Sequence, residues 1–435
     1  MHPAPQNARP VDHGSVPFDP VDPNADRAVE HFVDLRRSGL LRFAQLVRTR
    51  IDDTDAACLA TCLRVVDDTR EDWPALALHP YYTQWWARFS LAIRAGDTHA
   101  VSTLIPELAR FLVIPLARHG GLGGVTLTLP PTGRELRFPG HRRHVVRPAP
   151  SGSDRVPVTV TGDDVEIGRG SAAVRVPVAD LLDEEATGAT GFLVSRARIP
   201  GTRIEVDSSD PWLDEYLVRE SITKPSPGRS RDDVTPVAID APGLARLAGT
   251  LTGLSLVWPE MHRELLGYVR LVVPFSSEVR AAFSNVAWHG AVFLRPTLDD
   301  EVANVERLVH ETSHLRLNLV MAHTPMHDHA PDDVLPSPFR AGPRPVTGLY
   351  HGAFVVTRAA IALDRMYQQG GHAAYAERVP ILLAQVTAAL VTLRRHARLT
   401  ATGSALLDEV AEHLDALSDV YGIADAAEPR VYQEL

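Results

Sequence analysis

The sequence predicts a mainly helical α+β protein with a β-rich middle segment and a C-terminal helical region that binds a metal. Apolar residues recur at helical spacing in the first and last parts of the chain, and they alternate as in short strands in the middle. Two histidines four residues apart lie within one of the late helical patterns. With 435 residues, the chain is long enough for about two or three domains of about 150 residues each.

The first part of the chain changes character near residue 27. Residues 1–26 are rich in Pro, Asp and Asn and show no hydrophobic period, so we expect a flexible lead-in. A helical N-terminal region is predicted over 27–120, starting with the apolar series Phe32, Leu35, Leu40, Leu41, Phe43, Leu46 and Val47. Cys58 and Cys62 share one helix face in this region and are expected to be buried small apolar residues, since two cysteines make no disulfide framework.

The middle of the chain reads as a β-rich segment over 121–223. It follows the glycine-rich stretch 120–124, and short runs of alternating apolar residues mark its strands at 125–129, 156–160, 165–167 and 174–178. Between these strands lies a basic cluster made of Arg134, Arg137, His141, Arg142, Arg143, His144 and Arg147. The cluster is interpreted either as a solvated face or as a dock for an acidic peptide.

A polar linker at 224–241 precedes a helical region that extends over 242–435. One helix of this region is predicted to cover 300–320, with Thr297 and Asp300 in a capping box at its start. Its apolar stripe consists of Val302, Val305, Leu308, Val309, Leu315 and Leu319.

This helix carries the motif His310-Glu311-Thr-Ser-His314. Two histidines four residues apart lie one helical turn from each other, so both imidazoles can bind one cation, and Glu311 projects beside them. The motif by itself is typical of zinc peptidases, in which the glutamate deprotonates a metal-bound water. The sequence therefore predicts a metal site on this helix.

The third protein ligand decides the chemistry of such a site. The extended metzincin motif is absent, because Leu317 and Val320 occupy its glycine and histidine positions. A glutamate-ligated peptidase site is weakly supported, because the next glutamate after the motif is Glu377. His351, at the head of a second apolar helix, is the favoured third ligand; the alternatives are His323, His327, His329 and the carboxylate of Asp332.

The composition excludes several classes of protein. Against 44 Lys and Arg residues stand 54 Asp and Glu residues, and the net charge of −10 argues against a nucleic-acid partner, which needs a basic surface. The first residues lack the apolar stretch of a secretory signal. The longest apolar runs, such as 111–117, are much shorter than the roughly 18 residues of a membrane span. We therefore expect a cytoplasmic protein without a membrane partner.

Three segments together resemble a known bacterial family. They are His310-Glu-Thr-Ser-His314, Phe339-Arg-Ala-Gly-Pro-Arg-Pro-Val-Thr-Gly-Leu-Tyr-His-Gly352 and Trp288-His-Gly-Ala-Val-Phe-Leu294. Across about 240–370 the chain resembles the HExxH-motif peptide-modification proteins encoded in gene clusters for ribosomally made, post-translationally modified peptides. This family comprises iron(II)- and 2-oxoglutarate-dependent peptide β-hydroxylases.

The resemblance implies an oxidoreductase, a dioxygenase that hydroxylates a residue of a ribosomal precursor peptide. It implies that His310, His314 and His351 hold Fe(II), and that Glu311 orients a bound water or ligand. The co-substrate 2-oxoglutarate needs a cation for its distal carboxylate, and a guanidinium binds such a group through two hydrogen bonds. Arg344 is the first candidate for this cation, with Arg340 and Arg358 as rivals.

Two alternatives stand beside this function. One is a zinc metallopeptidase of the HExxH type with Glu311 as general base. The other is a catalytically inactive protein that binds a modified peptide or a partner enzyme. The expected partners of a hydroxylase are the precursor peptide and a radical-SAM enzyme of the same pathway.

Overall fold

The computed structural model describes residues 16–23, 26–131, 133–152, 154–186, 189–223, 233–296, 300–340 and 342–423. Its content of 58% helix and 14% strand confirms the mainly helical α+β class, with sheets in the middle of the chain and helices at the C-terminal end. The chain forms two compact units, which are described separately below.

Each unit is assembled from separate stretches of the chain. Unit 1 comprises residues up to Pro23, Gly249–Leu265 and Thr297–Leu435, and unit 2 comprises Asn24–Ala248 and Leu266–Pro296. This division differs from the contiguous regions that the sequence suggested, because residues 266–296 belong with the first half of the chain. Of the predicted linker 224–241, residues 224–232 lie outside the described part of the chain.

Unit 2 begins with the predicted helical region. The side chains of Asp26, Asp52 and Asp97 accept hydrogen bonds from first-turn N–H groups and so cap three of its helices. Its helices are α1 (Arg27–Val47), α2 (Asp53–Asp68), α3 (Trp73–Ala77), α4 (Pro80–Ala95), α5 (Thr98–Arg118), α6 (Val178–Leu182) and α7 (Pro211–Thr223), with 3₁₀ turns η1 (Arg70–Asp72), η2 (Gly120–Gly123), η3 (Gly170–Ala172) and η4 (Val286–Trp288). Cys58 and Cys62 of α2 are free and buried, as predicted.

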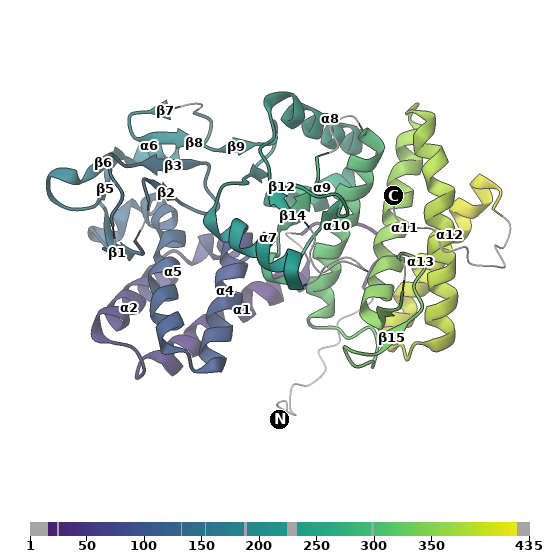
Figure 1. The fold of residues 1–435 in the computed structure, drawn as a ribbon, viewed down its shortest axis with the longest axis horizontal. Coiled ribbons are helices and arrows are strands. Elements are labelled where there is room, and N and C mark those ends of the chain that lie inside the picture. Colours follow the sequence, from purple (N-terminus) through teal and green to yellow (C-terminus); the bar gives the residue numbers. More distant parts are fainter. Residues whose placement is uncertain are drawn as a thin grey trace. The chain divides into compact units, whose positions relative to one another are not determined.

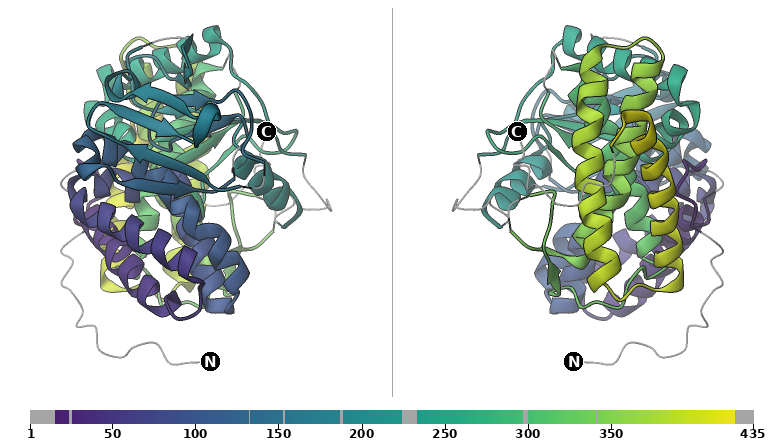
Figure 2. Two further views of the ribbon diagram at one scale, coloured as in Figure 1. Left: turned by 90° about the vertical axis from the view of Figure 1, so that its left-hand side faces the viewer. Right: turned by 90° about the vertical axis from the view of Figure 1, so that its right-hand side faces the viewer.

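The β-rich middle segment of unit 2 folds into two antiparallel sheets with the orders β1-β4-β5-β6 and β2-β3-β8-β7. Their strands are β1 (Thr126–Leu129), β2 (Glu135–Arg137), β3 (Arg143–Val146), β4 (Val156–Val160), β5 (Asp164–Ile167), β6 (Val174–Pro177), β7 (Ala189–Thr190) and β8 (Leu193–Ser195). Buried residues alternate with more exposed ones along β4 and β6, as the sequence pattern predicted. These strands are the blue-green arrows facing the viewer in Figure 2, left.

A third sheet of unit 2 has the order β13-β14-β12-β10-β9, with β11 paired to β12. Its strands are β9 (Ala197–Arg198), β10 (Glu205–Val206), β11 (Thr235–Pro236), β12 (Leu271–Ser276), β13 (Ala282–Phe283) and β14 (Ala291–Leu294). Strands β10, β12 and β14 are parallel to one another. The sequence had placed 271–294 in a helical region, and this was wrong because short, fully apolar runs have no period that separates strand from helix.

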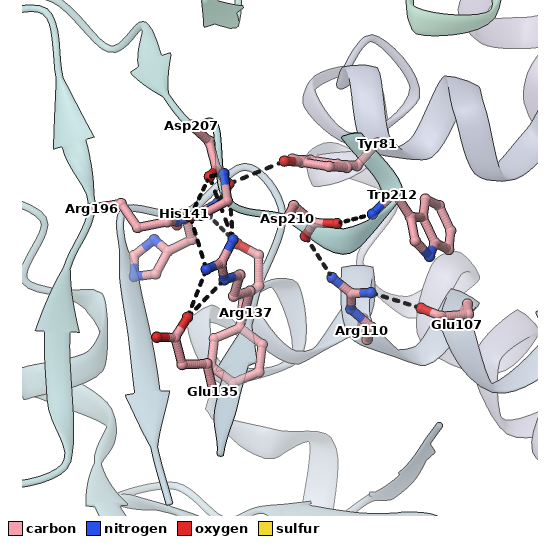
Figure 3. A network of polar contacts seen from close by, with 12 residues as sticks. Tyr81, Glu107, Arg110, Glu135, Arg137, His141, Arg196, Asp207, Asp210 and Trp212 are labelled. Atoms are coloured by element: carbon pink, nitrogen blue, oxygen red, sulfur yellow. Dashed lines mark hydrogen bonds and ion pairs between the residues drawn. The ribbon is translucent and has the colours of Figure 1, made fainter. Parts of the chain in front are cut away.

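The basic cluster at 134–147 is largely internal, so it is not the solvated face that the sequence suggested. His141 is 0% exposed and Arg143 is 1% exposed. The Arg137 guanidinium donates to the carboxylates of Glu135 and Asp207 (Figure 3). Carboxylates of the protein itself therefore compensate the positive charge of Arg137.

Unit 1 is a helical bundle. It contains the end of α8 (Ala241–Val257), most of α9 (Pro259–Tyr268), α10 (Glu301–Met321), α11 (Val346–Gln368), α12 (Ala373–His396) and α13 (Ala401–Tyr421), with a small hairpin of β15 (Val334–Leu335) and β16 (Arg344–Pro345). Helix α11 packs against α10, α12 and α13. The green and yellow helices at the C-terminal end of the chain show this packing in Figures 1 and 2.

The helix that carries the histidine motif begins one residue after its cap. Asp300 is the N-cap, and its carboxylate accepts a hydrogen bond from the N–H of Ala303. The predicted capping box also involved Thr297, which lies outside the described residues. An aspartate at the N-cap is sufficient to begin the helix at this point.

The segment 16–23 packs on the helices of unit 1, so this described part of the predicted flexible lead-in is fixed in place. Phe18 is 0% exposed and packs edge to face on Phe354 at a centroid distance of 5.3 Å. The backbone N–H of Phe18 donates to Glu409 at 2.7 Å. Arg316 donates to the carbonyl oxygens of Pro17 and Asp19 at 2.6 and 2.8 Å.

A buried carboxylate connects this segment with three helices. Glu264 of α9 is 0% exposed and accepts from Arg358 of α11 at 2.7 Å and from the N–H of Val21 at 2.8 Å. Arg316 of α10 lies 3.5 Å from its second oxygen. Because buried charges are costly without partners, these contacts fix α10 and α11 relative to each other.

Three of the described helices are long and apolar enough to cross a membrane by length and composition: α5, α11 and α12. The sequence analysis had predicted no membrane-spanning segment, because it considered only uninterrupted apolar runs. Within the structure, 72% of the apolar stretch of α5 and 89% of that of α11 are buried, compared with 39% for α12. Most of the apolar surface of α5 and α11 therefore contributes to the protein's own core.

Removal of the central carboxylate should destabilise unit 1. We expect Glu264→Gln to lower the free energy of unfolding by about 3 to 5 kcal/mol, because two buried guanidinium groups lose their anionic partner. Urea unfolding measures this loss. The control is Glu260→Gln on the exposed side of α9, where a 3.6 Å ion pair with Arg263 contributes little. Equal effects of the two variants would contradict the central role of Glu264.

Candidate metal centre

Three histidines meet between α10 and α11. Nε2 of His310 lies 3.1 Å from Nε2 of His314, one turn further along α10. Nδ1 of His314 lies 3.0 Å from Nδ1 of His351 on α11. His351 is 7% exposed, and the other two imidazoles are half-buried. The structure therefore brings together the two motif histidines and the favoured third ligand.

The spacing of the first pair suits a shared cation. Metal–nitrogen distances of about 2.0 to 2.1 Å place neighbouring ligand nitrogens roughly 3 Å apart. The third imidazole, however, faces the other nitrogen of His314, and within the described residues no group of three or more His, Cys, Asp or Glu side chains is arranged to hold a metal ion. The structure therefore places His351 beside the motif pair, on the Nδ1 side of His314.

The electrostatic environment keeps these imidazoles neutral, which is the form that binds a metal. Burial lowers the pKa of His310 to about 4 and that of His351 to about 4. The positive charge of Arg344 contributes to both of these decreases in pKa, whereas Glu306 acts in the opposite direction on His310. Burial, the two neighbouring imidazoles and Arg344 hold the pKa of His314 well below its usual range.

Glu311 lies on α10 between the two motif histidines and is 5% exposed. The hydroxyl groups that follow it are not available to a ligand as donors, because Thr312 donates to the carbonyl of Leu308 and Ser313 to that of Val309, both at 2.7 Å. Of the three residues 311–313, Glu311 is thus the one whose side chain could act on a ligand beside the imidazoles.

The three candidate arginines occupy different environments. Arg344 is half-buried on β16, and its charge acts on all three imidazoles. Arg340 is exposed. Arg358 is 0% exposed and donates to Glu264 and, at 3.2 Å, to the Ser313 hydroxyl. Arg344 is thus the candidate that lies in the field of the imidazoles, and Arg358 links α11 to α10.

The loop histidines have other partners. His327 Nε2 lies 3.0 Å from the Thr347 hydroxyl at the start of α11. His329 Nδ1 lies 2.9 Å from Asp333, and its Nε2 accepts from the N–H of Arg398 at 2.8 Å. These contacts attach the loop to neighbouring segments. Asp332, the carboxylate alternative, is exposed.

The segment that contains Arg340 and Arg344 packs on helix α11, which contains His351, through the ring of Phe339. Helix α11 begins at Val346, five residues before His351, and not at His351 as the sequence suggested. A Cβ atom at Gly352 would overlap the Phe339 ring, so only glycine allows this ring to pack on the helix. Phe339 is 6% exposed. The two ends of the motif Phe339–Gly352 are therefore in contact.

Sequence reasoning missed the residues that position the site, namely Glu264, Ser313 and Arg316. One signal was present: Arg316 interrupts the apolar stripe between Leu315 and Leu317, and a charge at such a position needs a buried partner. Glu264 carried no comparable signal, because its partners lie far away in the sequence.

The packing of the Phe339 ring against Gly352 can be tested by substitution. We expect Gly352→Ala to lower the free energy of unfolding by about 1 to 3 kcal/mol, because the added methyl group displaces a packed ring. Gly348→Ala, also on α11, meets only the Arg344 side chain at 3.7 Å and should be tolerated. Thermal unfolding of both variants measures the difference. A Gly352 variant as stable as the Gly348 variant would show that the ring does not pack there.

Comparison with known proteins finds no matching protein-family model for this chain and no matching curated protein. The resemblance to the HExxH-motif peptide-modification proteins therefore rests on the three sequence segments quoted above. Any conclusion about function depends on those segments and on the geometry of the three histidines.

Proposed function

We propose that this protein is an iron(II)- and 2-oxoglutarate-dependent oxidoreductase that β-hydroxylates a residue of a ribosomally made precursor peptide. The observation that carries the proposal is the contact of His351 with the HExxH pair, 3.0 Å from His314. The three imidazoles, which burial keeps neutral, would hold iron(II), and the resemblance to the peptide hydroxylases implies 2-oxoglutarate and O₂ as the co-substrates. Bound iron(II) with these two molecules supplies the oxidation of a C–H bond.

The residues of the chain have distinct roles in this proposal. His310, His314 and His351 would hold the metal. Arg344 would bind the distal carboxylate of 2-oxoglutarate through two charge-assisted hydrogen bonds, since its positive charge acts on the imidazoles from nearby. Glu311, the buried acid of the motif, would orient a water molecule or a ligand beside the metal.

Zinc peptidase activity is the second candidate function, because Glu311 stands between two histidines as in zinc peptidases. A thermolysin-like site would also need a glutamate ligand. The first glutamate after the motif, Glu377, is exposed on α12. Because the residue 3.0 Å from His314 is a third imidazole and not a glutamate, the site differs from a thermolysin-like one, and the resemblance to the peptide hydroxylases then favours the oxygenase over the peptidase.

The location and partners follow from the same function. A precursor peptide made by ribosomes is modified in the cytoplasm, so we place the protein there, with no nucleic acid or membrane as partner. The radical-SAM enzyme of such a pathway is the proposed partner enzyme.

Metal binding provides the first test. We expect the protein to bind one Fe(II) per chain, and His310→Ala/His314→Ala to lose it, because the variant retains one of three ligands. The control is His327→Ala/His329→Ala in the nearby loop, which should keep the metal. Metal content after anaerobic loading and desalting measures both. Full iron content in the first variant while it remains folded would contradict the site.

The co-substrate provides the second test. Mass spectrometry should show a peptide mass increase of one oxygen atom that requires 2-oxoglutarate. Arg344→Ala should keep the iron but raise the 2-oxoglutarate requirement about ten- to a hundredfold, because a charge-assisted contact is lost. Arg340→Ala, at an exposed position, serves as the matched control.

The peptidase alternative predicts a different result. In that case the zinc-loaded protein cleaves the peptide, and Glu311→Gln loses most of the rate, by about 10² to 10⁴, because the general base is gone. Such cleavage without dependence on 2-oxoglutarate would overturn the hydroxylase proposal.

A further inference from the structure

Unit 2 contains an arginine-lined pocket of about 620 Å³ that is separate from the histidine cluster of unit 1. Its charged lining consists of Arg142, Arg198, Arg203 and Arg270, with Glu185 as the acidic member. The turn Ile199–Thr202 completes the wall. A volume of several hundred Å³ is typical of small-molecule sites.

Two of the four guanidinium groups are already used by the protein. Arg142 donates to the carbonyl oxygens of Arg196 and Glu184 at 2.9 and 3.1 Å, which positions it without neutralising its charge. Arg198 forms an ion pair with the Glu184 carboxylate at 2.8 Å. Burial acts to raise the pKa of Glu184, but the hydrogen bonds with His141 and Arg198 outweigh burial and lower this pKa to about 2. The carboxylate of Glu184 is therefore ionised.

The other two guanidinium groups have no acidic partner among the described residues. Arg203 lines the pocket and is exposed. Arg270 is half-buried, and its Nε is buried without a hydrogen-bond partner. Burial, together with the positive charge of Arg203, lowers the pKa of Arg270. A half-buried guanidinium beside a second one is destabilising unless an anion joins them.

The fold places these two arginines together. Arg203 precedes β10 and Arg270 precedes β12, and these strands are parallel, with Glu205 opposite Leu271. The N–H of Glu205 donates to the carbonyl oxygen of Arg270 at 2.9 Å. Both residues therefore lie at the same end of two neighbouring strands, and the sheet brings their backbones close together.

From this geometry we infer that the pocket binds a small anion that carries two or three negative charges on phosphate or carboxylate groups. The four guanidinium groups carry four positive charges and the carboxylates of Glu184 and Glu185 carry two negative charges, which leaves two positive charges for the ligand. Planar guanidinium groups bind both kinds of oxyanion through paired hydrogen bonds. In a chain of net charge −10, such a local excess of positive charge attracts anions specifically to this place.

A small ligand fits the pocket better than an acidic peptide. Arg270 is half-buried and lines the pocket together with the Ile199–Thr202 turn and Leu266. A compact anion can contact Arg203 and Arg270 at once, whereas a peptide needs an extended basic surface. The neighbouring basic cluster does not provide that surface, because residues such as Arg143 are buried.

Isothermal titration calorimetry with inorganic pyrophosphate at constant ionic strength tests the inference. We expect saturable binding at one site, weakened about ten- to a hundredfold in Arg203→Gln/Arg270→Gln. The matched control, Arg42→Gln/Arg64→Gln, removes the same charge from exposed positions on α1 and α2 and should bind like the unmodified protein. Circular dichroism checks folding, and Arg203→Gln alone, at an exposed position, should still weaken binding if the double variant unfolds.

Titrations with other anions show whether the ligand's negative charge is on carboxylate or on phosphate groups. Tighter binding of citrate than of pyrophosphate would assign carboxylate groups to the ligand, and the reverse would assign phosphate, each within the inferred class. No saturable binding of either, or equal weakening in the control variant, would overturn the site. A hexaglutamate peptide that binds more tightly than both anions would overturn the small-ligand assignment in favour of an acidic peptide.

Discussion

The buried carboxylate of Glu264 is the constraint on which the histidine cluster depends. It binds Arg358 of α11 at 2.7 Å and lies 3.5 Å from Arg316 of α10. Each arginine follows a histidine on its own helix by no more than two turns, so the common partner sets how the two helices are placed along each other. Contact between His314 and His351 is a consequence of that placement.

The charged groups around Glu264 also explain why residues 16–23, which precede the first helix, pack on the helices of unit 1. Two arginines share one carboxylate, so part of their charge must be compensated elsewhere. Backbone carbonyl oxygens of Pro17, Phe18 and Asp19 provide this compensation for Arg316. Packing of Phe18 on Phe354 then adds apolar burial to the polar contacts. A segment of low hydrophobicity is therefore fixed by a charge on a distant helix.

The arginines of unit 2 have carboxylate partners at one place and lack them at another. Around Asp207 they are paired: Arg137, Arg196 and the Tyr81 hydroxyl all reach its carboxylate (Figure 3). At the arginine-lined pocket the pairing is incomplete, because Arg203 and Arg270 meet no acid among the described residues. The guanidinium groups around Asp207 are thus neutralised by the protein itself, whereas Arg203 and Arg270 are the ones that the proposed anion would neutralise.

The sequence by itself determined the features that depend on neighbours within a few residues. Helical periodicity predicted the helices of both ends, alternation predicted strands such as β4 and β6, and spacing alone placed His310 and His314 on one face of a helix. Whether that pair binds a metal, and which reaction follows, remain predictions of the motif and the resemblance.

Only the tertiary structure decided the features that depend on partners far apart in the chain. The strands β12 and β14 joined unit 2 because their uniformly apolar runs fit a parallel sheet with β10, which no local period reveals. Thirty-seven residues separate His314 from His351, and their contact follows from the packing of α10 on α11. The pairing of Glu264 with Arg358 and the meeting of Arg203 with Arg270 have the same origin, since electrostatic interactions act through space and leave no pattern in the sequence.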